Sequence, residues 1–114
     1  MNKGSCHCGK VRFEVDADIS KGLACNCSMC QRKGTLLIFV PEDKFKLLAG
    51  EDSLKDYQFG KKHIHHNFCS TCGVTPFAYG SAPDGSVMKA VNLRCIDDID
   101  LTKVEVQNHD GRSI

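Results

Sequence analysis

The spacing of eight cysteines constrains the fold of this 114-residue chain more than any other feature. Seven of them form three groups and one stands alone: Cys6-His7-Cys8, Cys25-Asn26-Cys27-Ser28-Met29-Cys30, Cys69-Ser70-Thr71-Cys72, and Cys95. Cysteines separated by one or two residues are typical of metal ligands. A disulfide framework is the alternative, but these cysteines cluster instead of spreading, and the polar first ten residues lack the apolar segment of a signal peptide. The pattern therefore favours metal sites.

Two of the groups have a glycine directly after the second cysteine, in Cys8-Gly9 and Cys72-Gly73. Glycine accepts a positive φ, so a tight turn there would fold the backbone around a metal and direct N–H groups at sulfur. Two such pairs supply the four thiolates of a structural zinc site, which adds on the order of 10 kcal/mol to folding. Buried free thiols and an iron–sulfur cluster are the alternatives, and the latter lacks its usual C-x2-C-x2-C run. We predict one closed zinc site, formed by Cys6, Cys8, Cys69 and Cys72.

The remaining group offers three ligands within six residues: Cys25, Cys27 and Cys30. Three protein ligands leave one coordination position for water or substrate, and a bound zinc lowers the pKa of a thiol placed there. The alternative is a closed structural site whose fourth ligand comes from Cys95, His63, His65 or His66. Strand alternation would place His63 and His65 on one face and His66 on the other. Cys95 has its own simpler interpretation as a small buried apolar side chain.

Basic residues follow this group directly, in Gln31-Arg32-Lys33-Gly34. The guanidinium of Arg32 could bind a substrate carboxylate in bidentate fashion, with the Lys33 ammonium beside it. The alternative is that both are ordinary solvated residues.

Strand patterns account for the rest of the chain. Lys10–Asp16 alternates apolar and charged residues, and the apolar run Thr35–Val40 predicts a central strand buried on both faces, with Phe45–Leu48 as its partner. Further short strands are expected at Leu54–Phe59, His63–Phe68, Thr75–Tyr79, Val87–Leu93 and Val104–Val106. Pro83-Asp84-Gly85 predicts a hairpin turn, and Ser28–Gly34 holds at most a short helical turn. We predict a single all-β domain over residues 1–114, with minimal helix.

Net charge and hydropathy limit the classes of partner that the protein is expected to bind. Lys and Arg number 15 against 14 Asp and Glu, so a net charge of +1 provides no field to attract nucleic acid or an acidic membrane. No window approaches the ~20 apolar residues of a membrane-spanning helix. We expect a soluble, cytosolic protein that binds neither nucleic acid nor a membrane.

Three motifs, in order, resemble the glutathione-dependent formaldehyde-activating enzyme family, which also includes centromere protein V. They are GSCHCGKV from Gly4, CNCSMCQRKG from Cys25 and FCSTCG from Phe68. The resemblance implies a β-rich fold of the Mss4-like kind. It also implies two zinc ions per chain, a structural one on Cys6, Cys8, Cys69 and Cys72 and a catalytic one on Cys25, Cys27 and Cys30.

The activity implied by the resemblance is condensation of formaldehyde with glutathione, which is classed as a carbon–sulfur lyase reaction from its reverse. The implied mechanism is zinc-assisted attack of a thiolate on the aldehyde carbon. The chain is shorter than the best-known members and matches no glutathione-binding residues, so we expect a small thiol adduct, such as S-(hydroxymethyl)glutathione, as substrate. A non-catalytic zinc module for a thiol, a metal or a protein is the second hypothesis.

Overall fold

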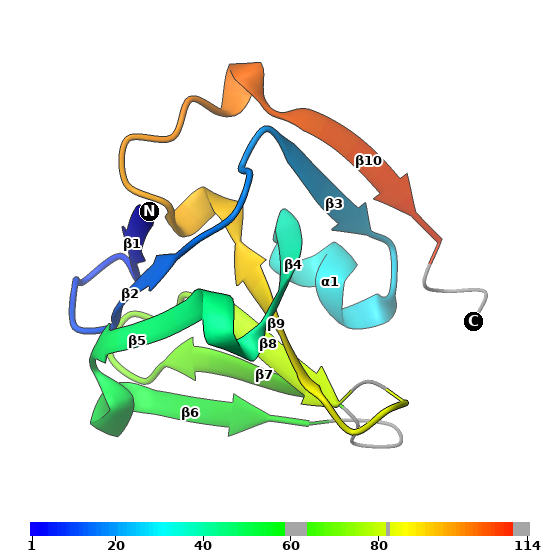
Figure 1. The fold of residues 1–114 in the computed structure, drawn as a ribbon. Coiled ribbons are helices and arrows are strands. Elements are labelled where there is room, and N and C mark those ends of the chain that lie inside the picture. The colour runs from blue at the N-terminus through cyan, green and yellow to red at the C-terminus, as the bar shows by residue number, and fades with distance from the viewer. Residues whose placement is uncertain (59–63, 82, 111–114) are drawn as a thin grey trace.

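Ten strands in two sheets build the protein in the computed structural model, which describes residues 1–58, 64–81 and 83–110. The smaller sheet has the order β1-β2-β5: β1 (Asn2–Ser5), β2 (Arg12–Val15) and β5 (Phe45–Ala49). The larger sheet has the order β10-β3-β4-β9-β8-β7-β6: β10 (Glu105–His109), β3 (Lys21–Cys25), β4 (Leu37–Pro41), β9 (Val87–Asn92), β8 (Phe77–Ser81), β7 (Ile64–Cys69) and β6 (Leu54–Tyr57). Figure 1 shows β3 and β10 side by side at one edge, with β6 and β7 at the other.

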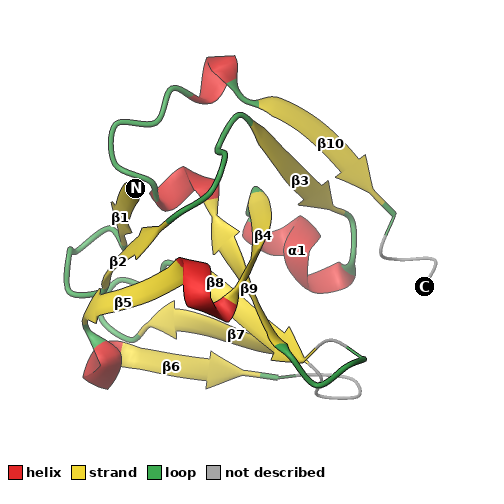
Figure 2. Ribbon diagram, in the orientation of Figure 1, coloured by secondary structure: helices red, strands yellow, loops and turns green. Residues whose placement is uncertain are grey.

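Helical structure is minor, as Figure 2 shows. Within the described ranges the only α-helix is α1 (Ser28–Lys33), which follows β3. Four 3-10 turns complete the helical elements: η1 (Glu42–Lys44), η2 (Glu51–Ser53), η3 (Leu93–Cys95) and η4 (Leu101–Lys103). The all-β prediction is therefore confirmed. No helix among these residues is long and apolar enough to cross a membrane.

The larger sheet has two faces with different roles, and β4 shows how the sequence divides them. Leu36, Ile38 and Val40 are at most 8% exposed and lie in the main core, whereas Phe39 between them is 54% exposed. Side chains alternate between the faces of a strand, so Leu37 and Phe39 share the second face. Leu37 is 8% exposed and packs there in a smaller core with Cys30, Ala78 and Ala90, so this face opens only at Phe39. The prediction that this strand is buried on both faces is therefore wrong at Phe39.

The pairing of β5 differs from the prediction for Phe45–Leu48. β5 pairs with β2, where Phe45 lies opposite Val15, and β4 pairs instead with β3 and β9. The turn η1 follows Pro41 and takes the chain out of the larger sheet. The Phe45 ring then stacks on Phe13 with centroids 5.5 Å apart, so aromatic packing favours the smaller sheet.

Two strands, β1 and β3, were not predicted from the sequence. Their segments, NKGS and KGLAC, contain residues of low strand propensity, so the pattern was weak. Glycine is nevertheless required within both. A Cβ on Gly22 would lie 2.6 Å from a side-chain atom of Leu36, and one on Gly4 would collide with the Phe13 ring. These glycines let the strands approach the core closely.

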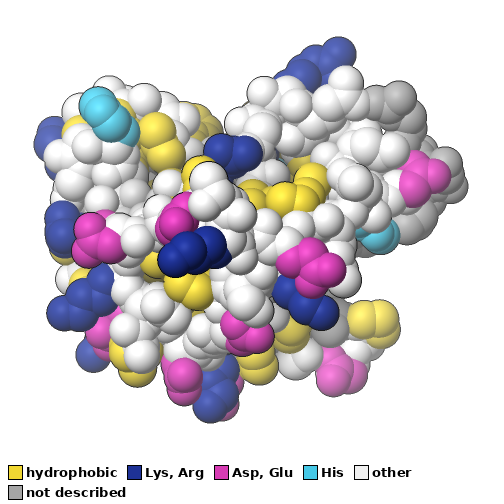
Figure 3. Space-filling model, turned by 90° about the horizontal axis from the view of Figure 1, so that it is seen from above, with side chains coloured by type: hydrophobic (Ala, Val, Ile, Leu, Met, Phe, Trp, Pro, Cys, Tyr) yellow, Lys and Arg dark blue, Asp and Glu magenta, His cyan; other side chains and the backbone are white. Residues whose placement is uncertain are grey.

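The other predicted strands are present with shifted ends. Phe59 and His63, at the ends of two predicted strands, lie outside the described residues. β8 and β9 form the expected antiparallel hairpin, with Ser81 opposite Val87. Acidic and basic side chains are interspersed on the face seen in Figure 3, in keeping with the net charge of +1.

Candidate metal centres

Four cysteines far apart in the sequence meet at one end of the smaller sheet. Cys6 and Cys8 lie in the loop from β1 to β2, and Cys69 and Cys72 lie at the end of β7 and in the turn after it. Their Sγ atoms are all within 4.8 Å of one another. The Sγ of Cys8 is 3.5 Å from that of Cys6 and 3.6 Å from that of Cys69. The loop and the turn therefore form one cluster of four thiols.

Glycine shapes both halves of this cluster. Gly9 has a φ of 82° and Gly73 a φ of 80°, as the glycine argument predicted. The Gly9 N–H donates to the carbonyl of Cys6 at 3.2 Å, and the Gly73 N–H donates to that of Cys69 at 2.8 Å. A further backbone N–H, from Val11, donates to the Cys6 Sγ at 3.4 Å. The turns thus aim the sulfur atoms at a common point.

Burial makes this cluster a structural element. Cys6 is 2% exposed and Cys69 is fully buried, and both pack in a small core with Val11. Burial opposes ionisation of Cys72, but the backbone N–H groups of Val74 and Cys8 outweigh it and lower the pKa of Cys72 to about 6. A thiol that ionises readily at Cys72, beside the buried sulfur atoms of Cys6 and Cys69, suits a metal cation.

The second cluster lies where β3 meets α1. Cys25 ends the strand, Cys27 caps the helix and Cys30 lies within it, with all three Sγ atoms within 4.8 Å of one another. The Cys30 N–H donates to the Cys27 Sγ at 3.3 Å, and the Cys27 N–H donates to the Cys25 Sγ at 3.4 Å. Gly34, with φ of 71°, ends the helix and donates to the Cys30 carbonyl at 3.0 Å. One helical turn therefore gathers three thiols.

The three thiols have different environments. Burial, with the neighbouring Cys27 sulfur, raises the pKa of Cys30 to about 12. For Cys27, burial acts in the same direction, but the backbone N–H of Cys30 and the adjacent thiols outweigh it, and the pKa falls below its usual value. Cys27 therefore ionises more readily than Cys30.

No other Cys, His, Asp or Glu side chain joins this second cluster in residues 1–58, 64–81 and 83–110. Cys95 is 8% exposed and lies in the main core, where its sulfur is 3.8 Å from the Thr75 carbonyl oxygen. Its predicted role as a buried apolar side chain is confirmed. His63, a second candidate for a fourth ligand, lies outside the described residues.

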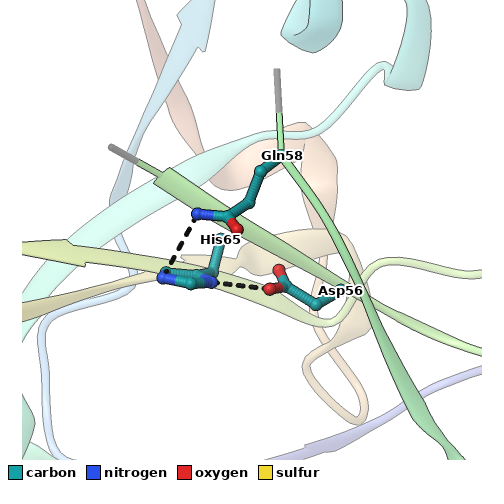
Figure 4. Close-up of polar contacts among 3 residues, drawn as sticks. All are labelled: Asp56, Gln58 and His65. Atoms are coloured by element: carbon teal, nitrogen blue, oxygen red, sulfur yellow. Dashed lines mark hydrogen bonds and ion pairs between the residues drawn. The ribbon is translucent and has the colours of Figure 1, made fainter. Parts of the chain in front are cut away.

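His65, a third candidate, is engaged elsewhere. Its Nδ1 lies 2.6 Å from Oδ2 of Asp56, and its Nε2 lies 3.4 Å from the Gln58 amide nitrogen (Figure 4). Its ring stacks on Tyr79 with centroids 4.4 Å apart and an interplanar angle of 8°. These contacts tie β6, β7 and β8 together and give His65 a structural role.

A cavity of about 650 Å³ adjoins the three-cysteine cluster. Its wall combines residues of α1 with residues of six strands of the larger sheet, and it includes both buried side chains, such as Leu37, and exposed ones, such as Phe39. The strand and helix residues that line it are Leu23, Cys25, Cys30, Lys33, Leu37, Phe39, Ile64, His66, Ala78, Tyr79, Gly80, Ser81, Met88, Ala90 and His109, and Cys27 and Thr75 complete the lining. This volume is within the usual range of small-molecule sites.

His66 and Lys33 meet at this cavity, a contact that the sequence did not predict. The Lys33 Nζ lies 3.0 Å from the His66 Nδ1. His66 is 6% exposed, and burial together with the Lys33 charge lowers its pKa to about 4, so the ring is neutral near pH 7. Alternation along the predicted strand correctly separated His65 from His66. This alternation could not show which face of the strand lies at the cavity.

Arg32 lies on the exposed side of α1. Its Nη1 donates to the Ser28 carbonyl at 3.0 Å, and it is not among the cavity-lining residues. Lys33, its neighbour, lines the cavity instead. Binding of a substrate carboxylate by Arg32 stays a prediction.

The fold and the two clusters together define a β-rich protein whose cysteine groups fit zinc binding. The family model described as glutathione-dependent formaldehyde-activating enzyme matches residues 1–109, and the chain belongs to this family. Its fold is accordingly of the Mss4-like kind.

A solved structure supports the same fold. The crystal structure of a Rhodobacter sphaeroides protein, a target of the Northeast Structural Genomics effort, superposes with a TM-score of 0.78 at 28% sequence identity. The match covers 92% of this chain and 99% of the other. The two proteins are therefore similar over nearly their whole lengths.

Proposed function

We propose that this protein is a zinc-dependent carbon–sulfur lyase that forms or cleaves a small thiol adduct. The observation that carries the proposal is the position of three thiols at the wall of a cavity of about 650 Å³, in a chain of this family. S-(hydroxymethyl)glutathione is the adduct that the family description suggests. A reducing cytosol would keep all eight thiols free, as they are in the structure, so we place the activity there.

Two zinc ions per chain would complete the clusters. Tetrahedral zinc with Zn–S bonds of about 2.3 Å separates its sulfur ligands by about 3.8 Å, close to the distances of 3.5 and 3.6 Å in the four-thiol cluster. Cys6, Cys8, Cys69 and Cys72 would hold a structural ion, and Cys25, Cys27 and Cys30 a catalytic one. At the latter site zinc would supply Lewis acidity and lower the pKa of a thiol in its fourth position.

The reaction requires few groups from the chain. In the forming direction the substrate sulfur bonds to the aldehyde carbon, and the thiol proton ends on the former carbonyl oxygen; cleavage reverses both changes. Lys33 places a positive charge near the sulfur atoms of Cys27 and Cys30 and would offset the negative charge that these sulfur atoms carry as metal ligands. The contact with His66 holds the lysine at the cavity. Arg32 would bind a substrate carboxylate after leaving the Ser28 carbonyl.

The test is a panel of thiols and aldehydes assayed with the zinc-loaded protein. Cys27→Ser removes a thiol of the three-cysteine cluster, and Cys95→Ser is the matched control because Cys95 is a buried thiol outside both clusters. We expect adduct formation with the wild type and Cys95→Ser, and a loss of at least about a hundredfold with Cys27→Ser. Equal inactivity of all three proteins against every adduct would remove the enzyme proposal and favour a non-catalytic zinc module.

The same assay tests whether Arg32 binds a substrate carboxylate. Arg32→Gln should raise the KM of carboxylate-bearing thiols by about tenfold if the guanidinium binds them, and should leave neutral thiols unaffected. Unchanged KM values for both classes would show that Arg32 has no part in substrate binding.

A further inference from the structure

The cavity wall contains an apolar strip that crosses the larger sheet from β3 to β7. Cross-strand register places its residues opposite one another in neighbouring strands: Leu23 and Leu37, Phe39 and Ala90, Ala78 and Ala90, Gly80 and Met88, Ile64 and Gly80. Phe39 remains 54% exposed and Ile64 44% exposed, although both are large and apolar. Exposed apolar surface of this kind commonly marks a binding site.

Charged groups are scarce on this wall. Among the described residues that line the cavity, Lys33 carries the one ammonium, and none is an Asp, Glu or Arg. Lys33 already contacts His66. His66 and His109 are the lining imidazoles, and the low pKa of His66 leaves it neutral near pH 7.

This wall is poorly matched to glutathione. The tripeptide carries two carboxylates, an ammonium and two peptide groups, and each would lose water on entering an apolar cavity. Lys33 could pair with one carboxylate, but no lining carboxylate among the described residues could pair with the ammonium. An apolar substituent loses no such hydration and gains roughly 25 cal/mol for each Å² that it buries.

We infer that the cavity binds thiols with an apolar body, alkyl or aryl, and the hemithioacetals that they form with aldehydes. The inference deepens the proposed function and rests on it. The sulfur lies toward Cys25, Cys27 and Cys30, and the apolar body lies along the strip that contains Phe39 and Ile64. The balanced reaction is RSH plus R′CHO giving RSCH(OH)R′, in which one carbon–sulfur bond forms and the thiol proton moves to oxygen.

Calorimetric titration of the zinc-loaded protein with two thiols tests the inference without relying on turnover. The probes are 2-phenylethanethiol and glutathione. The former has an apolar body and no polar group other than its thiol. We expect 2-phenylethanethiol to bind at least about tenfold more tightly, with a negative heat-capacity change that reports apolar burial. Equal or tighter binding of glutathione would overturn the inference.

Substitutions in the strip locate the binding. Phe39→Ser should weaken binding of 2-phenylethanethiol by about tenfold and leave glutathione unchanged, because it removes only apolar wall. Leu48→Ser is the matched control, since Leu48 is 44% exposed on β5 and does not line the cavity. Circular dichroism establishes that both variants fold. Equal effects of the two substitutions would contradict binding along the strip.

The assay of adducts separates this inference from the proposed function. Tight binding of the apolar thiol, with turnover of its formaldehyde adduct, supports both. Tight binding without turnover of any adduct supports the ligand class and overturns the lyase proposal. Turnover of the glutathione adduct alone supports the lyase and overturns the ligand class, and absence of binding by either thiol overturns both.

Discussion

The ammonium of Lys33 lies 3.0 Å from Nδ1 of His66 and joins the last residue of α1 to β7. Since the lysine can only donate, the imidazole accepts at Nδ1 and carries its proton on Nε2. The contact therefore selects one neutral tautomer of a buried histidine at the cavity wall.

We predict that replacing His66 with Gln removes part of the acid sensitivity of the fold. Burial, with the Lys33 charge, lowers the pKa of His66 to about 4 in the folded protein, against 6.5 in the unfolded chain. Between these values only the unfolded chain binds the proton, so stability is complete above pH 6.5 and falls as the pH drops toward 4. The loss amounts to about 3 kcal/mol.

Urea unfolding of zinc-loaded wild type and His66→Gln, at about pH 7.5 and about pH 5, measures this effect. Acid release of the metal acts on both proteins, so the informative quantity is the difference between them. The free energy of unfolding of the wild type should fall more than that of the variant. Parallel losses in the two proteins would contradict a neutral, buried His66.

Cys69→Ser should prevent stable folding at 25 °C. Cys69 is fully buried in the four-thiol cluster, and a structural zinc there would supply about 10 kcal/mol, comparable to the whole stability of a small domain. Circular dichroism melting and zinc analysis measure the result. Cys95→Ser, at a buried thiol outside the clusters, should keep the zinc content of the wild type and should unfold in a cooperative thermal transition. A folded Cys69→Ser protein with a full zinc content would disprove the structural role.

If each cysteine cluster holds a zinc ion, as proposed, the two ions should leave the protein at different rates. An ion at Cys25, Cys27 and Cys30 would adjoin the cavity and have three protein ligands, whereas an ion in the other cluster would have four, of which Cys6 and Cys69 are at most 2% exposed. A mild chelator should therefore remove one equivalent first, and a colorimetric zinc indicator follows it. Cys27→Ser should lack this fast fraction from the start. Equal resistance of both ions would indicate two closed structural sites.

Gly73→Ala should weaken retention of the structural zinc. With φ of 80° at this position, an L-residue costs about 1–2 kcal/mol, while nothing lies within 4 Å of the added Cβ. Gly85→Ala is the matched control, because its φ is 88° and its Cβ also meets open space, in a hairpin turn away from the clusters. Urea unfolding should show a similar fall in the free energy of unfolding for both variants. Only Gly73→Ala should release the zinc of the four-thiol cluster faster to a chelator.

The four-thiol cluster was the most predictable part of the site. Paired cysteines followed by glycine specify their turns through local chemistry, and the φ angles of Gly9 and Gly73 agree with it. Strands with period-two patterns were likewise predictable, because alternation is also a local property.

Contacts between distant segments were less predictable. The stacking of Phe45 on Phe13 decides the sheet of β5, and neither residue's neighbours in the sequence carry that information. The same holds for the contact between Lys33 and His66, which depends on the order of strands in the larger sheet. The apolar run around Phe39 predicted a strand, but the run itself could not show that Leu37 lies in a second core while Phe39, on the same face, is an exposed part of the cavity wall.

The ligands of the four-thiol cluster emerge from the ribosome at different times. Cys8 and Cys69 are separated by 61 positions, so the ribosome releases the first pair of ligands well before the second. At about 5–20 residues per second, the first pair waits on the order of seconds for its partners. During that interval a nascent chain presents two reactive thiols without a closed site, and oxidants or competing metals have their best opportunity then, before the last ligand emerges.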